Sequence, residues 1–325
     1  MRPMKDAPGS ENVPRTEPVV SSRGRYGTQN LVVLGAQVLG WAVVLTAVEL
    51  APYVALRIAL IALFCLLMQG VFTMMHEHFH RNAHWVPAID YAIGLVGSTL
   101  FGTSATLHRV HHWGHHVRNR SEAERGEFIH PGEAPALKVA LYYFAICGGL
   151  WLGGLVFPLI SFFIPWRFVR FLARTKRFNT YAAMFEQFKE RDWTRMRLEA
   201  LVLYAFWGAL LAWGPWSTAT LVPAYVAFAF TWSWLQWVYH LRTPIHVIEG
   251  TYNLRAPWLV RVLFLSFNYN LTHHRHPSMP WQELRGASDP KETQPLWYRV
   301  LLMALPPRPF PTNDAELAAL DKRYF

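Results

Sequence analysis

The chain has 325 residues, of which 52% are hydrophobic and 15% aromatic, and its formal net charge at pH 7 is +10. This composition is unusually apolar for a soluble domain of this length and favours a protein that lies in a bilayer. The basic residues lie between apolar runs of bilayer length rather than on a compact soluble module, so we expect no nucleic-acid partner. Both cysteines, Cys65 and Cys147, lie inside apolar runs, which excludes a disulfide framework and a thiolate metal site.

The two ends of the chain are more polar than its middle. Residues 1–28 mix Pro, Ser, Arg and Glu and lack the apolar segment of a signal peptide, so they predict a disordered tail. We expect a single membrane domain over residues 29–288, followed by a cytoplasmic C-terminal tail over residues 289–325.

Apolar runs in the first third of the chain predict a membrane hairpin. Leu31 to Leu50 and Tyr53 to Met75 are each about as long as the roughly 20 residues that cross a bilayer. Ala51-Pro52 between them predicts a turn. The next run, Ala88 to Leu107, is rich in Gly, Ser and Thr, and we expect it to form a helix at the membrane interface.

The second half predicts another hairpin, Leu201 to Trp213 and Thr218 to Tyr239, and before it a broken apolar run, Leu137 to Trp166. Arg167 to Arg197 carries nine basic and three acidic residues, so the positive-inside rule places it in the cytoplasm. The broken run must then enter and leave on one side, as a re-entrant hairpin or an interfacial pair. The expected fold is an all-α polytopic membrane protein, with about four transmembrane helices, interfacial or re-entrant helices and a cytoplasmic histidine-rich cap.

All 15 histidines lie in or beside clusters at the ends of apolar runs. Ionisable groups at membrane depth are costly and usually functional. Several of the polar residues share one helical face because they are spaced i, i+4 or i, i+3, i+4. The pairs are His76 with His80 and Gln236 with His240; the triples are His108, His111 and His112, and Asn270, His273 and His274. These groups supply nitrogen ligands for two metal ions, and the spacing suits iron, copper or zinc alike.

Three of these segments resemble the histidine boxes of the membrane fatty acid desaturase superfamily. They are His76-Glu77-His78-Phe79-His80, His108-Arg109-Val110-His111-His112 and Asn268-Tyr269-Asn270-Leu271-Thr272-His273-His274. His276-Pro277-Ser278-Met279-Pro280-Trp281 resembles the Pro-Ser-x-Pro-Trp ending of the third box. The resemblance implies an oxidoreductase with two iron ions, bound by histidines, that uses O2 as co-substrate. It implies ligands at His76, His80, His108, His111, His112, His240, His273 and His274.

The resemblance also implies the reaction: attack on the C–H bonds of a fatty acyl chain that is linked to CoA, to a carrier protein or to a lipid. Desaturation is the favoured outcome, and hydroxylation and acetylenation are the alternatives. The family's third box begins with a histidine where this chain has Asn270, so either Asn270 binds weakly or through water, or His276 replaces the missing ligand. Further residues expected to bind metal or to support its ligands are Gln236, Asn270, His276, His115, His116 and Glu77.

Electrons must come from another protein, because the sequence has no flavin or dinucleotide fingerprint. We expect a ferredoxin or a haem protein as the donor. Basic residues that follow the broken apolar run are candidates for its docking site, and equally for contacts with anionic lipid. They are Arg167, Arg170, Arg174, Lys176 and Arg177.

Two other classes of protein also place histidines at a membrane. His76-Glu77-x-x-His80 is the zinc-protease pattern, in which Glu77 would be the general base, but such a site needs an acidic third ligand and the sequence offers Asn270 and His273 instead. A non-catalytic haem or metal-binding membrane protein would explain the histidines but not the repeated triples.

Overall fold

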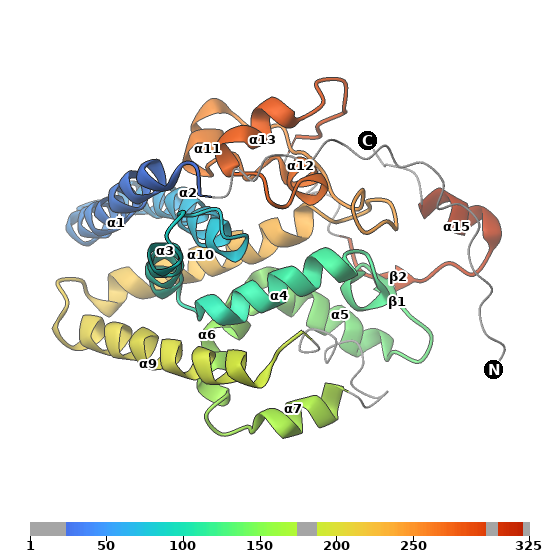
Figure 1. The fold of residues 1–325 in the computed structure, drawn as a ribbon, viewed down its shortest axis with the longest axis horizontal. Helices are drawn as coiled ribbons and strands as arrows, with labels where there is room; N and C mark the ends of the chain where they lie inside the picture. The colour runs from blue at the N-terminus through green and yellow to red at the C-terminus, as the bar shows by residue number, and fades with distance from the viewer. Residues whose placement is uncertain (1–23, 174–186, 297–304, 321–325) are drawn as a thin grey trace.

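The computed structural model describes residues 24–173, 187–296 and 305–320. This part of the chain is mostly α-helical, as predicted (Figure 1). Its one sheet is a parallel pair of two-residue strands, β1 (Phe128–Ile129) and β2 (Arg308–Pro309). The pair brings a segment of the expected C-terminal tail back to the helical domain. Most of the expected N-terminal tail lies outside the described residues.

The predicted first hairpin is confirmed as α1 (Gly27–Leu50) and α2 (Val54–Phe79), which are both long and apolar enough to cross a membrane. The two helices pack against each other through buried apolar side chains such as Leu45 and Met68. α2 ends at His80, so the first pair of histidines lies at the same end of the hairpin as the start of α1.

The expected interfacial run divides into two helices. α3 (Pro87–Phe101) has 15 residues, which is too short to cross a bilayer core of about 30 Å. It ends earlier than predicted because Gly102 adopts a left-handed conformation (φ 97°), a common helix terminator. α4 (Ala105–Arg118) then begins at Ser104, whose side chain accepts a hydrogen bond from the backbone N–H of Leu107.

The broken apolar run forms α5 (Pro135–Phe144) and α6 (Leu150–Ile160), joined by a π-helical turn (Ala145–Gly149). Together they are long and apolar enough to cross a membrane. The chain kinks at Cys147 and Gly148, where the backbone is not helical and Gly148 has a φ of 113°.

Contacts show where the two ends of this kinked pair lie. Tyr142 on α5 packs against Trp237, near the end of α10 (Thr218–Val238) that precedes His240. Beyond α6, the carbonyl of Ser161 accepts hydrogen bonds from Arg197 near the start of α9 (Glu190–Trp213). Both ends therefore return to the end of the bundle that carries the histidines, as the predicted re-entrant path requires.

The second predicted hairpin is confirmed as α9 and α10, which are joined at Gly214-Pro215. α1, α2, the α5–α6 segment and α9 are the four candidate membrane spans. α10 has 21 residues, but it is not among these four candidates. It packs along α2 in the centre of the bundle, as Figure 1 shows.

Among the short elements, α12 (Asn270–Arg275) and α13 (Trp281–Ala287) cover the histidine-bearing end of the bundle. α12 and α13 lie above α2 and α10 in Figure 1. Trp281 at the start of α13 donates a hydrogen bond to Asn30 of α1. The short elements are η1 (Glu122–Glu124), α7 (Trp166–Ala173), α11 (Trp258–Leu263), α12 (Asn270–Arg275), α13 (Trp281–Ala287) and α15 (Asp314–Leu320).

Aromatic side chains fill the core beneath this end of the bundle. Phe72 of α2 contacts Trp232 of α10 at 5.3 Å between ring centroids, and Phe101 of α3 lies 5.0 Å from the same Trp232. All three side chains are buried. They form an apolar layer directly below the histidines, because Phe72 also packs against His76, one turn farther along α2.

Candidate metal centre

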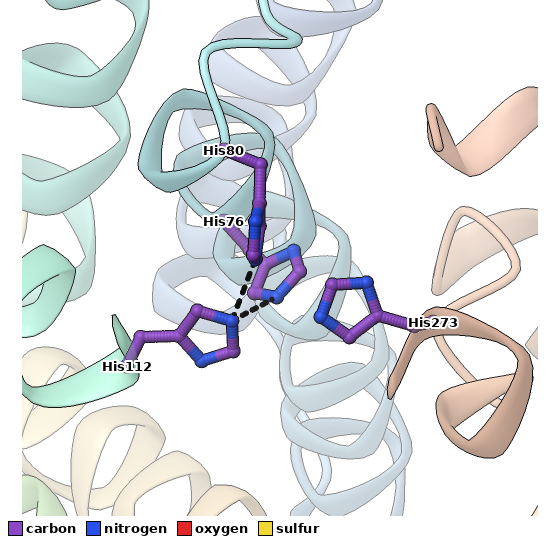
Figure 2. A group of neighbouring side chains, drawn as sticks. All are labelled: His76, His80, His112 and His273. Atoms are coloured by element: carbon purple, nitrogen blue, oxygen red, sulfur yellow. Dashed lines mark hydrogen bonds between the residues drawn. The ribbon is translucent and has the colours of Figure 1, made fainter. Parts of the chain in front are cut away.

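Four histidines from three helices converge at the end of α2. His76 and His80 come from α2 and its C-terminal residue, His112 comes from α4 and His273 from α12 (Figure 2). The Nε2 atom of His112 lies 2.9 Å from Nε2 of His76 and 2.8 Å from Nε2 of His80. One nitrogen from each of the four rings lies within 4.8 Å of the others.

These distances suit a metal ion better than hydrogen bonds alone. A neutral imidazole has one N–H and one lone pair, so one Nε2 atom cannot form good hydrogen bonds with every Nε2 around it. An ion at about 2 Å from each nitrogen would hold ligand atoms about 3 Å apart. Nδ1 of His76 is buried without a hydrogen-bond partner in the described part of the chain, so this ring is held by packing and by its Nε2 contacts.

A second group lies beside the first and contains His115 of α4, His240 after α10 and His274 of α12. The ring centroids of His115 and His240 are 4.7 Å apart, and those of His115 and His274 are 5.1 Å apart. Nε2 of His274 is buried and has no hydrogen-bond partner among the described residues. The second group is therefore also a cluster of ring nitrogens, and at least one of them has a lone pair that no described residue engages.

Hydrogen bonds at Nδ1 orient two members of the second group. His115 contacts the carboxylate of Glu124 at 2.6 Å, and His240 donates to the carbonyl oxygen of Gly250 at 3.0 Å. A ring whose Nδ1–H is donated to a carboxylate or carbonyl keeps the lone pair of Nε2 for a metal. Both rings thus present the nitrogen that faces the group in the form that binds metal.

His116 of α4 joins the two groups. Its Nε2 lies 2.9 Å from Nε2 of His112 and 2.9 Å from Nε2 of His273, and its ring centroid is 4.6 Å from that of His274. The two groups are therefore neighbours within one histidine-rich centre. Two adjoining groups of this kind are typical of one site that holds two metal ions, rather than of two separate sites with one ion each.

Burial keeps these imidazoles neutral. It holds the pKa values of His112, His273 and His274 well below their ordinary range, and it lowers the pKa of His116 to about 2. Neighbouring histidines lower each pKa further, because a second positive charge so close is unfavourable. Neutral rings have the lone pairs that metal binding requires.

The structure does not bring His108 or His111 into either group. His108 lies one turn earlier on α4, in contact with Thr103 at 3.0 Å and with its ring 5.3 Å from Phe101. The ring of His111 packs against Phe188, at 5.7 Å between ring centroids. Burial lowers their pKa values to about 4 and about 3, respectively.

The reason for this difference is a repeated pattern on α4. The spacing i, i+3, i+4 occurs at His108, His111 and His112, and again one turn later at His112, His115 and His116. Both triples share one helical face, so the spacing does not distinguish them. The contacts of the later residues select the second triple, because His116 meets His273, and His115 meets His240 and His274.

The remaining predicted residues lie around the centre, outside both groups. Asn270 accepts a hydrogen bond from the hydroxyl of Thr251 at 2.7 Å through Oδ1. Nε2 of Gln236, one turn before His240, is buried without a partner in the described part of the chain. Glu77 is buried on α2, and His276 ends α12.

A buried carboxylate fixes the start of α4. Glu199 of α9 accepts hydrogen bonds from the hydroxyl of Ser104 at 2.5 Å, from the backbone N–H of Thr106 at 2.8 Å and from the hydroxyl of Tyr91 at 2.9 Å. Because α4 begins at these residues, Glu199 sets the position of the helix that carries three of the clustered histidines.

Comparison with protein families finds a match over most of the chain. The model of the family described as fatty acid desaturase matches residues 50–302, which include every histidine of both groups. The chain belongs to the fatty acid desaturase family. It is accordingly a lipid desaturase-like oxidoreductase, and its apolar helices are those of an integral membrane protein. A comparison with curated proteins finds no match.

The zinc-protease interpretation of His76 and His80 has no support in the described part of the structure. That site needs an acidic third ligand near the histidine pair. In the part of the chain that the structure describes, the group around His76 and His80 consists of histidines alone.

Proposed function

We propose that this chain is an O2-dependent di-iron oxidoreductase that acts on the C–H bonds of a fatty acyl chain, and that its reaction is desaturation. The observation that carries the proposal is the pair of adjacent, buried histidine groups in a chain of the fatty acid desaturase family. Imidazole ligands alone suit iron, copper or zinc. Family membership supports iron, and zinc does not fit because desaturation requires redox chemistry that zinc does not provide.

The proposed ligands differ from those implied by the sequence resemblance. One ion would be held by His76, His80, His112 and His273, with His116 as a further ligand, and the other by His115, His240 and His274. His108 and His111 are left out, because their contacts are with Thr103 and with aromatic side chains. When bound, the two ions would supply the O2 and one-electron chemistry that amino-acid side chains lack.

The side chains around the site would orient the ligands and exclude water. Glu124 and Gly250 hold rings of the second group by hydrogen bonds, and Phe267 packs at 5.0 Å from the ring of His76. An acyl chain is apolar, and the buried layer of Phe72, Phe101 and Trp232 beneath the histidines suits it. A dry, fixed position for one methylene is what selective C–H chemistry needs.

Hydroxylation remains a second candidate because of Asn270. The second group has three histidines, and Asn270 lies where the family's third box begins with a further histidine. Its side-chain oxygen accepts a hydrogen bond from Thr251, so a metal contact would be weak or through water. Fewer nitrogen ligands on one ion change its electronics, which bears on whether hydrogen is removed or oxygen inserted.

We further propose that the histidine centre faces the cytoplasm and receives electrons from a ferredoxin or a haem protein. The positive residues after α6 support this orientation by the positive-inside rule. Arg167 and Arg170 of the proposed docking region lie on α7. Arg174, Lys176 and Arg177 lie outside the described residues. Phe168 and Phe171 on α7 are exposed, so the same face also suits contact with lipid.

Expression in a lipid-producing host, followed by mass spectrometry of its acyl chains, tests the proposed function. A desaturase yields chains that lack two hydrogens, and a hydroxylase yields chains with one added oxygen. The His274→Ala variant, matched for its amount in the membrane, should yield neither. Unaltered acyl chains with the wild-type protein and a supplied electron donor would contradict the proposal, as would equal product from the variant.

A further inference from the structure

A cavity of ≈ 880 Å³ is lined in part by residues of α2 and α4, and none of the clustered histidines is among its lining residues. It lies between the end of α2, the start of α3, the middle of α4 and the start of α9. Its lining is strongly basic and includes four arginines. They are Arg81, Arg109, Arg191 and Arg195.

Part of the positive charge of this arginine cavity has no carboxylate partner. Arg109 pairs with Asp192 at 3.1 Å, and Arg195 lies over the ring of Tyr91. Over residues 24–173, 187–296 and 305–320, neither Arg81 nor Arg191 has an ion pair with a carboxylate. The one acidic residue in the lining, Asp90, is already engaged by His78 at 2.6 Å and by backbone N–H groups.

Two helices also point their positive ends at the cavity. Pro87 and Ala88 are the first residues of α3, and Arg191, Thr194 and Arg195 lie in the first two turns of α9. The N-terminus of a helix carries unsatisfied N–H groups and a partial positive charge that favours anions. Helix ends and arginines therefore act in the same direction, and are offset in part by Asp90 in the first turn of α3 and by Glu190 and Asp192 in the first turn of α9.

The rim of the cavity is apolar and lies at the level where α9 changes from mainly charged to mainly apolar residues. The first two turns of α9 are charged, and after the buried Glu199 an apolar stretch that suits a membrane follows from Ala200. Leu198 is 60% exposed and Trp85 is 57% exposed, and both line the cavity. Tryptophan beside arginine is typical of the headgroup layer of a bilayer.

We propose that the arginine cavity binds the phosphate of an anionic phospholipid headgroup. The guanidinium fork matches phosphate oxygens in pairs, and the exposed Trp85 and Leu198 suit the first part of an acyl tail. A soluble anion would gain nothing from that rim, and a hollow at the headgroup layer suits a lipid better than an acidic protein surface. The binding requires no metal, so it is independent of the proposed reaction.

The test is binding of short-chain phosphatidylglycerol to the purified, metal-loaded full chain in detergent, followed by native mass spectrometry. The double variant Arg191→Gln, Arg195→Gln removes two positive charges from the cavity and no proposed metal ligand. Its affinity for phosphatidylglycerol should fall roughly thirtyfold, from about 1 kcal/mol per arginine. The matched control Arg255→Gln, Arg285→Gln removes two exposed arginines elsewhere and should bind like the wild type.

Two further probes separate the sources of the phosphate. Diacylglycerol of the same chain length lacks the phosphate and should bind weakly to the wild type, and inorganic phosphate should compete only poorly with the lipid. Equal loss of affinity in the control variant, equal binding of diacylglycerol, or full displacement by an equal concentration of inorganic phosphate would overturn the proposal. If the double variant is misfolded by circular dichroism, Arg81→Gln alone replaces it, with the same expected direction.

Discussion

Hydrogen bonds to Nδ1 decide which nitrogen of each histidine is left for a metal. His115 illustrates this at the residue scale, because the carboxylate of Glu124 contacts its Nδ1 at 2.6 Å and its other nitrogen faces His240 and His274. The same carboxylate lies 3.6 Å from Arg118, so its own position is fixed. A ligand that is oriented in this way loses little freedom when it binds an ion.

Replacement of this carboxylate should weaken the second metal site. Glu124→Ala leaves the His115 ring free to rotate and removes the partner that raises the basicity of its Nε2. We expect metal affinity to fall about 10- to 100-fold. Retention of metal against a graded series of chelator concentrations measures this. Glu122→Ala, on the same short helix, is the control and should retain metal like the wild type; equal losses in both variants would argue against the orienting role.

Metal content also distinguishes the two candidate triples of α4. His115→Ala and His274→Ala should each remove most of one ion per chain, because each takes one nitrogen from a group of three histidines. His108→Ala should retain both ions, because His108 contacts Thr103 and Phe101 instead. Elemental analysis of the purified variants gives the answer. Greater metal loss in His108→Ala than in His274→Ala would favour the earlier triple.

Those two triples show how far the sequence could predict the site. Spacing and resemblance identified His76, His80, His112, His240, His273 and His274, all of which the structure places in the two groups. The resemblance ranked His108 and His111 above His115 and His116, although both pairs extend one helical face from His112 and spacing alone does not separate them. The choice depends on the position of α4 relative to the end of α2, and tertiary packing determines that position.

At the scale of elements, the kink between α5 and α6 turns the chain back towards the histidines. Its backbone requires glycine, since Gly148 has a φ of 113°, where other residues are strained. The sequence predicted the interruption from its glycines and prolines, and the return to one side from the positive charge that follows. It did not predict that Gly102 and Ser104 would divide the third apolar run, because a single glycine is tolerated within many helices.

A substitution at this kink should therefore destabilise the fold. Gly148→Ala forces a Cβ atom into the left-handed region and should lower the free energy of unfolding by about 1 to 2 kcal/mol. Gly153→Ala is the control, because a Cβ at this position on α6 meets no atom within 4 Å and alanine favours helix. Thermal unfolding in detergent compares the two variants. A midpoint temperature of unfolding for Gly148→Ala at or above that of Gly153→Ala would contradict the predicted backbone strain at residue 148.

For the whole molecule, the fold brings the ends of four helices to one place. The clustered histidines come from α2, α4 and α12, together with His240, which follows α10. The aromatic core lies beneath them. The sequence predicted the membrane hairpins well, because long apolar runs are the strongest signal that a chain carries. It could not show that the histidines form two adjoining groups, since that arrangement depends on how all four helices pack.

The most direct test of the central claim is the metal content of the purified wild-type protein. The histidine groups predict two iron ions per chain and no haem, measured by elemental analysis together with absorption spectroscopy. A single zinc ion per chain, or a haem spectrum that accounts for all the iron, would contradict the account.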